Sequence, residues 1–175
     1  IVLRMAAVLV LLVVVVLLIG LLLPRAHTAA VEAHYRASPG QVYAAIDNVG
    51  NGPQWRTGLQ RVEILSAAGE PTRWRETADW GTLTFVHESN HPGQQIVSRI
   101  VDEGQGFGGT WTYDIVPAGN GSMLRVTERG EVSNPLYRFM SRFIFGYYRS
   151  AETYVRDLGR HLGEDVTPVR VTDRS

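Results

Sequence analysis

The sequence predicts an α+β domain in which an antiparallel sheet grips a long C-terminal helix, preceded by one transmembrane helix. Three observations lead to this fold class: an apolar run near the N-terminus, a series of short alternating segments separated by turns, and a hairpin that feeds directly into an amphipathic helix. Consecutive strands joined by short turns pair in antiparallel fashion. A sheet that grips a helix tends to enclose an apolar cavity, which points toward a binder of hydrophobic small molecules.

Residues 1–25 are predicted to form a transmembrane anchor. Every residue from Met5 to Leu23 is apolar except Gly20. A run of this length, at about 1.5 Å per residue, gives roughly 28 Å, which is enough to cross the core of a bilayer. A signal peptide is the alternative, although its apolar region is usually only about 7–15 residues long. We therefore expect a single-pass membrane protein.

The side of the membrane on which the domain lies stays open. Arg4 precedes the apolar run, whereas Arg25, His27 and Arg36 follow it. The positive-inside rule then leans toward a cytoplasmic domain, but so few charges do not assign the side.

The rest of the chain is long enough for one domain with its own core, predicted over residues 26–163, with a disordered polar tail at 164–175. Cysteine is absent, which excludes disulfides, a thiol nucleophile and cysteine-based metal sites. All seventeen basic residues are arginine, so neither a Schiff-base lysine nor a phosphate-loop lysine is available. The net charge of zero argues against a general nucleic-acid binder.

Seven strands and two helices are predicted along this domain. After a short linker at 26–30, Ser38 and Pro39 have the residue types of a helix N-cap and first helical position. A short helical face follows and ends at 50–53, and the segment at 80–81 is read as a kink between two strands. The predicted strands are 31–36, 59–66, 72–78, 82–88, 94–101, 110–116 and 123–132.

One long amphipathic helix is predicted from Asn134 to Leu162. At 100° per residue, its apolar side chains fall on one broad arc that includes Phe139, Phe143 and Tyr147. Gly146 lies in the middle of the helix and is read as a kink or a close approach to the sheet. The opposite face carries a stripe of arginines, which is either a solvated surface or a docking face for anionic lipid heads or an acidic partner. These residues are Arg138, Arg142, Arg149, Arg156 and Arg160.

The chain resembles the START-like (SRPBCC) superfamily, and within it the polyketide cyclase/dehydrase-like branch, over roughly residues 31–164. The segments that carry the resemblance are Ser38-Pro39-Gly40-Gln41-Val42-Tyr43, Asp47 with Pro53-Gln54-Trp55, Phe107-Gly108-Gly109-Thr110-Trp111, Glu128-Arg129-Gly130-Glu131-Val132 and Asn134-Pro135-Leu136-Tyr137-Arg138-Phe139. The resemblance implies a helix-grip fold, in which a curved sheet of about six or seven strands and the C-terminal helix enclose a hydrophobic cavity. Members bind lipids, sterols, polyketides or plant hormones, and some are enzymes, but no catalytic motif is shared.

Strand alternation predicts which side chains face such a cavity. The alternative is that they only fill a core. Three polar members, Glu76, His87 and Glu128, interrupt apolar faces, and a buried carboxylate is paired, protonated or functional. They would orient a ligand hydroxyl or act as acid and base, unless a one-residue register slip or an arginine partner explains them. The predicted ligand-binding residues are Trp74, Glu76, Phe85, His87, Ile100, Trp111, Tyr113, Glu128, Phe139, Phe143 and Tyr147.

Motifs for cofactor or metal chemistry are weak. Residues 104–109 match G-x-G-x-x-G but lead into a strand rather than a helix, so we read them as a flexible loop at a cavity mouth. His87 and His91 are four residues apart, but His91 precedes Pro92-Gly93 in a turn, so the two are not on one helix face, and G-x-S-x-G is absent. We therefore predict no cofactor, no metal and no catalytic residue.

These observations lead to three alternative hypotheses for the function. The first is a membrane-anchored domain that binds a hydrophobic small molecule (lipid, isoprenoid or polyketide-like) without transforming it. The second is a cyclase or dehydratase that uses His87 or Glu128 as acid or base and requires both to reach one point in the cavity. The third is a docking module that uses the arginine face. Ligand identity and oligomeric state stay open.

Overall fold

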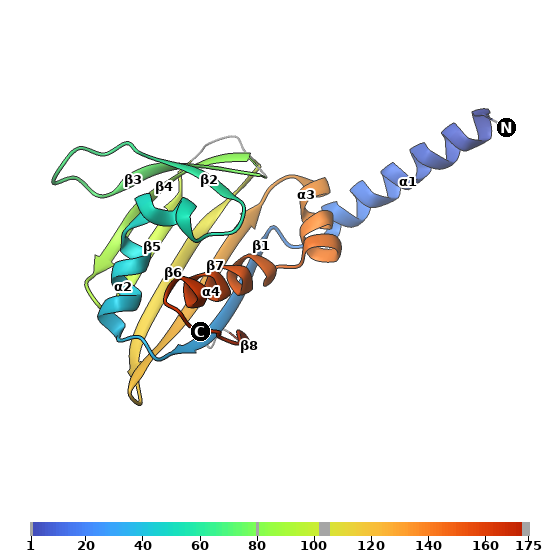
Figure 1. Ribbon diagram of the computed structural model, residues 1–175. Coiled ribbons are helices and arrows are strands. Elements are labelled where there is room, and N and C mark those ends of the chain that lie inside the picture. Colours follow the sequence, from blue (N-terminus) through green and yellow to red (C-terminus); the bar gives the residue numbers. More distant parts are fainter. Residues whose placement is uncertain (1, 80, 102–105, 173–175) are drawn as a thin grey trace.

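The computed structural model describes residues 2–79, 81–101 and 106–172, and its main feature is one antiparallel sheet. Within these ranges the sheet has eight strands in the order β2-β3-β4-β5-β6-β7-β1-β8 (Figure 1). The bounds are β1 (Ala26–Tyr35), β2 (Leu59–Ile64), β3 (Arg73–Ala78), β4 (Gly81–His91), β5 (Gln95–Ile100), β6 (Phe107–Ala118), β7 (Gly121–Val132) and β8 (Val169–Val171). The α+β helix-grip architecture is therefore confirmed. Of the predicted kink, residue 80 lies outside the described residues.

The predicted linker and a three-residue part of the predicted tail, Val169–Val171, are instead part of the sheet. Residues 26–30 form the first half of β1 and pair with the end of β7, and Ala29 and Ala30 are buried. Short side chains gave this segment a linker-like composition, although the alternation from Val31 to Tyr35 continues back through it to His27. In the tail, Val166 is buried and β8 pairs with β1, so this part of the predicted tail packs on the domain. Residues 173–175 lie outside the described residues.

The predicted helix start at Ser38 is confirmed. Helix α2 (Pro39–Asp47) has a capping box, in which the Ser38 hydroxyl accepts from the Gln41 amide and the Gln41 side chain accepts from the Ser38 amide. The 3-10 helix η1 (Val49–Gln54) follows and leads into β2. These two helices lie across one end of the sheet and position the loop that contains Trp55 and Arg56.

The long C-terminal helix is broken, contrary to the continuous helix expected from the sequence. Helix α3 (Pro135–Met140) is capped by Asn134, runs into the π turn η2 (Ser141–Phe145) and stops at Gly146. Gly146 has a φ of +75°, a conformation open to glycine but costly for other residues, so the chain turns sharply there. Helix α4 (Arg149–His161) then begins in a new direction. The kink predicted at Gly146 is therefore confirmed, but the apolar periodicity continued across it and did not show that the helix ends there.

Helix α4 lies over the sheet (Figure 1), and core side chains pack between the two. Its buried face carries Ala151, Tyr154, Val155 and Leu158, which pack against inward side chains of β1, β5, β6 and β7. Figure 1 also shows helix α1 (Val2–Leu22) projecting away from the sheet, with α3 beside its C-terminal end. Its segment Arg4–Leu22 is long and apolar enough to cross a membrane, as a signal sequence also is.

Candidate functional site

A cavity of about 670 Å³ lies between the sheet and α4. Pockets that hold small organic molecules typically measure about 300–1,000 Å³, so this one has room for a ligand. Aromatic and aliphatic side chains from β3 to β6 make up much of its wall, including Trp74, Leu83, Phe85, Ile100 and Trp111. The core row of the sheet, which runs through Ile96, Tyr113, Val126 and Val31, closes the cavity on one side.

All but two of the predicted site residues line this cavity. Those that do are Trp74, Glu76, Phe85, His87, Ile100, Trp111, Tyr113, Glu128 and Tyr147. Phe139 and Phe143 are not part of the lining, and Phe143 is 58% exposed. They were assigned to the site by extending one helical arc across Gly146, where the chain in fact turns. No register slip occurs at Glu76, His87 or Glu128, because all three face inward.

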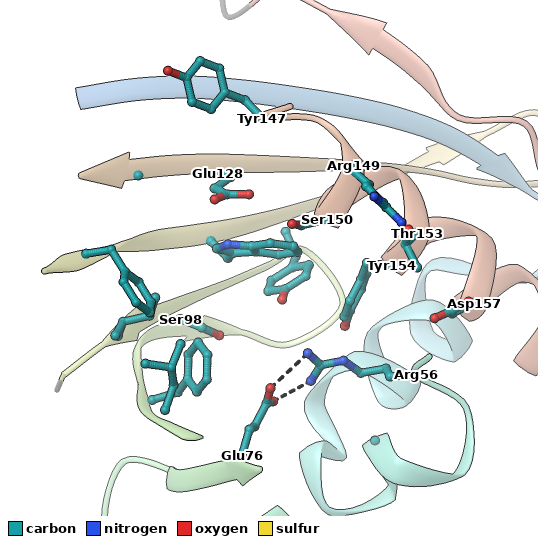
Figure 2. A pocket seen from close by; sticks show the side chains of 18 of the residues that line it. Arg56, Glu76, Ser98, Glu128, Tyr147, Arg149, Ser150, Thr153, Tyr154 and Asp157 are labelled. Carbon is teal, nitrogen blue, oxygen red and sulfur yellow. Dashed lines mark hydrogen bonds and ion pairs between the residues drawn. The ribbon is translucent and has the colours of Figure 1, made fainter. Parts of the chain in front are cut away.

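A buried ion pair occupies one end of the cavity (Figure 2). Arg56 donates to both carboxylate oxygens of Glu76, at 2.5 and 3.0 Å, and the indole Nε1 of Trp74 donates to the same carboxylate at 3.0 Å. The Glu76 side chain is 2% exposed and that of Arg56 is 25% exposed. Burial lowers the pKa of Arg56, but the charge and hydrogen bonds of Glu76 raise it further, so the net shift is upward. The arginine-pairing interpretation of Glu76 is therefore confirmed.

Two tyrosines stand beside this pair. The rings of Tyr113 and Tyr154 are 5.3 Å apart, and the Arg56 guanidinium lies 5.4 Å from the Tyr154 ring centre. Burial raises the pKa of both phenols, and their mutual interaction raises that of Tyr113 further, so both stay protonated at neutral pH. This end of the cavity therefore offers neutral hydroxyls next to a fixed guanidinium.

His87 is buried between two polar neighbours. Its Nδ1 lies 3.1 Å from the Ser98 hydroxyl, and its Nε2 lies 4.0 Å from an Asp47 carboxylate oxygen. Nε2 has no hydrogen-bond partner among the described residues. Burial lowers the pKa of His87, and Asp47 only partly opposes this, so the ring is neutral at pH 7.

Glu128 forms a separate polar group with two residues of other elements. His27 Nε2 lies 3.6 Å from one Glu128 oxygen, and the His27 ring stacks on Tyr147 at 4.1 Å. The other oxygen, Oε2, is buried without a hydrogen-bond partner among the described residues. A buried acceptor without a partner is costly, so this atom is available to accept a hydrogen bond from a ligand.

The strand register separates Glu128 from His87. Glu128 pairs across the sheet with Trp111, Trp111 with Ser98, and Ser98 with His87. Three strand spacings of about 4.8 Å place the two residues roughly 14 Å apart along the sheet. His87 is also engaged by Ser98 and Asp47 at its own end. The prediction that Glu128 and His87 act together on one reacting atom is therefore not supported.

Several lining residues were missed from the sequence, above all Arg56, His27 and Tyr154. Arg56 lies in a loop, and no periodicity marks its direction. His27 is in phase with the alternation of β1, so extending that strand would have found it. Tyr154 lies on the same apolar arc as Tyr147 but was not included among the predicted site residues. Phe107 and Gly108 also line the cavity, whereas residues 102–105 of the glycine-rich segment lie outside the described residues.

The predicted arginine stripe is only partly exposed. Arg138 is 5% exposed and donates to backbone carbonyls, so it does not belong to a solvated face. Arg142, Arg149, Arg156 and Arg160 are exposed, and Arg160 also pairs with the buried Asp157. Among the described residues no group of three or more His, Asp or Glu is arranged to hold a metal ion.

Comparison with known proteins places these features in context. A family model described as "Polyketide cyclase / dehydrase and lipid transport" matches residues 26–152. No match was found among curated protein sequences. A START superfamily protein from Mycobacterium smegmatis is similar in structure, with a TM-score of 0.60 and 19% identity over 80% of this chain and 98% of the other.

Two further similar structures are proteins of biosynthesis. Norcoclaurine synthase from Thalictrum flavum has a TM-score of 0.63 and 13% identity, over 79% of this chain and 87% of that one. The di-domain ARO/CYC StfQ from the steffimycin biosynthetic pathway has a TM-score of 0.63 and 12% identity over 76% of this chain. This chain spans about half of that protein, 49% of its length. At these identities the likeness concerns the fold.

Proposed function

The chain belongs to the polyketide cyclase/dehydrase and lipid transport family, and from this premise we propose that it is a membrane-anchored domain that binds a hydrophobic small molecule between the sheet and α4. The observation that carries the proposal is the cavity itself, which is about 670 Å³ in volume and walled largely by aromatic and aliphatic side chains. Solidly packed cores leave few voids larger than a water molecule, so a space of this size has a use other than stability.

The polar groups of the lining narrow the class of ligand. Neutral phenols and a guanidinium stand at the Glu76 end, and an unpartnered carboxylate oxygen stands at Glu128. The two ends are separated by the apolar wall of β4, β5 and β6. An apolar molecule with a hydrogen-bond donor at one end and an acceptor at the other would satisfy both groups.

The exposed apolar surface of helix α1 supports the proposal that this helix anchors the chain in a membrane. Its large apolar side chains are exposed along most of its length, including Val8, Leu12 and Leu18, and only its C-terminal end packs against the domain. A helix with apolar residues on all sides is unstable in water and stable in a bilayer.

The test is to isolate the full chain from cell membranes in detergent and to analyse it by native mass spectrometry after release from the micelle. A small molecule of defined mass that stays with the protein is expected. Ser98→Phe, which fills part of the cavity, should reduce its occupancy, whereas Thr82→Phe at an exposed site of β4 should not. Binding in the cavity would be rejected if the two variants carried the same amount of the small molecule. It would also be rejected if neither the wild type nor any variant carried one.

A second candidate function is a cyclase or dehydratase, and one observation favours it. Glu128 faces the cavity with a free oxygen and has His27 within 3.6 Å, an arrangement in which the carboxylate could remove a proton from a bound carbonyl compound. In that case His27, rather than His87, would be the partner of Glu128. Conversion of the co-purifying molecule by the wild-type chain and not by Glu128→Gln would favour this function.

A further inference from the structure

Five large apolar side chains are exposed together on α3 and η2. They are Leu136, Tyr137, Phe143, Ile144 and Phe145, each between 43% and 58% exposed, and we call them the apolar platform. Soluble domains rarely leave so many large apolar residues of one short segment in water, and such patches mark interaction sites. The platform lies outside the sheet–α4 core, so packing within the domain does not explain it.

The platform is held against the C-terminal end of α1. A Cβ at Gly20 would collide with the Pro135 carbonyl, so the two segments approach as closely as backbones can. The Arg138 guanidinium donates to the Leu23 carbonyl at 2.9 Å and to the Ser133 carbonyl at 3.1 Å, which ties α3 to the end of α1. Since the end of a transmembrane helix lies at the membrane surface, these contacts fix the height of the platform relative to a bilayer.

The mouth of the cavity lies next to the platform. Among the described lining residues, nearly all the exposed ones belong to the junction between η2 and α4: Phe145, Gly146, Arg149 and Ser150. Phe145 is both a platform residue and a lining residue. This η2–α4 junction is on the side of the domain from which α1 projects (Figure 1), and we place the opening there.

We propose that the apolar platform is embedded in the boundary between headgroups and acyl chains of the bilayer that α1 spans, so that the cavity opens onto the membrane and takes up a membrane-resident amphiphile. The proposal rests on the membrane anchor and the binding cavity proposed above. Exposed Arg25 and Arg142 flank the platform, and arginines beside exposed aromatic residues are typical of segments that lie in the interface of anionic membranes. A ligand at this mouth could leave the bilayer without crossing water.

The absence of cysteine makes a direct test possible, because a single introduced cysteine can be labelled alone. The full chain is placed in nanodiscs of phosphatidylcholine and phosphatidylglycerol, with a nitrobenzoxadiazole label on Ile144→Cys (platform), Ser150→Cys (mouth) or Asn120→Cys (control). Asn120 lies at the β6–β7 turn, while the other end of that hairpin meets Arg25 after α1. Twelve-residue strands put the control about 40 Å away.

Lipids that carry a doxyl quencher near the headgroup should quench the labels at 144 and 150 several-fold more than the label at 120. Equal quenching at 144 and 120 would overturn the proposal, and quenching at 144 but not at 150 would overturn the assignment of the mouth. Phe143→Cys serves as a second platform site if Ile144→Cys does not fold.

Failure of the underlying function is recognised separately. Resistance of the chain to extraction by alkaline carbonate tests the anchor, and the co-purifying molecule tests the cavity. If both are present and the label at 144 is not quenched, only the membrane-facing platform is rejected.

Discussion

Arg138 and Leu23 join the two parts of this molecule: the guanidinium on α3 donates a hydrogen bond of 2.9 Å to the carbonyl at the end of α1. The last carbonyls of a helix lack partners within the helix, and a basic side chain there also complements the helix dipole. One buried arginine therefore caps helix α1 and fixes the segment that carries the apolar platform.

Arg138→Gln should loosen this junction. Hydrogen bonds from a charged donor contribute about 1.5–3 kcal/mol each, and a loss of about 2 kcal/mol corresponds to roughly thirty-fold more frequent local opening. Hydrogen exchange of the full chain in nanodiscs should accelerate by this order in residues 136–145 and not in β6 or β7. Arg156→Gln, exposed on α4, is the control and should leave exchange of this segment unchanged. An unchanged hydrogen-exchange rate in Arg138→Gln would show that Arg138 does not hold α3 against α1.

Replacing one partner of the Arg56–Glu76 pair should lower the free energy of unfolding strongly. Replacing both should lower it by less than the two single replacements added together. Removing one partner of a buried pair costs roughly 3–5 kcal/mol, because the other charge is left buried. Since a quarter of the Arg56 side chain is exposed, we expect the lower end of this range for Arg56→Met and for Glu76→Gln.

The double variant should be less destabilised than the sum of the single variants. Urea unfolding in detergent, followed by the fluorescence of the cavity tryptophans, measures all three. Strictly additive effects would show that the two side chains do not stabilise each other.

Local patterns predicted most of the sheet, because alternation and turn residues act over a few residues. Two such local signals are the helix cap at Ser38 and the alternation that predicts which side chains of β3 to β7 face inward. The structure agrees with both. The packing of α3 against α1 joins residues more than a hundred positions apart. Helical periodicity alone could not reveal it.

The candidate site was predictable where it is built from strands and not where it is built from loops. Glu76, His87 and Glu128 were assigned to the cavity from alternation. Arg56 and Asp47, which lie beside Glu76 and His87, were not, because they come from a loop and a helix end and meet these strands only in the folded chain. His27, beside Glu128, could have been found by extending the alternation of β1. Ion pairs between distant segments leave no periodic signal.

Stability should fall in mild acid because of His87. Burial lowers its pKa in the folded chain below the value of about 6.5 in the unfolded chain, so the unfolded chain binds a proton first as pH decreases. The loss therefore begins near pH 6.5 and continues until the folded pKa is reached. Urea midpoints at pH 7.5 and 5.5 should differ less for His87→Gln than for the wild type. An equal difference would show that other groups cause the acid dependence.

Glu128→Gln should weaken ligand binding without unfolding the chain. The substitution keeps the shape of the side chain but replaces a charged acceptor, whose Oε2 is buried without a partner, by a neutral amide. If the ligand donates a hydrogen bond to this atom, affinity should fall by about 10- to 100-fold, the equivalent of a charged hydrogen bond. Titration with the co-purifying molecule, monitored by tryptophan fluorescence, measures the effect, since Trp55, Trp74 and Trp111 all line the cavity.

Glu131→Gln on the same strand is the matched control, because Glu131 is exposed on the opposite face of β7 and should bind as the wild type does. Equal affinity of Glu128→Gln and the wild type would mean that no ligand donor reaches Oε2. Unchanged affinity together with loss of conversion would instead assign Glu128 to the chemical step, because a group that acts only in the transition state changes turnover and not ground-state binding. The same variant therefore separates a binding domain from a cyclase or dehydratase.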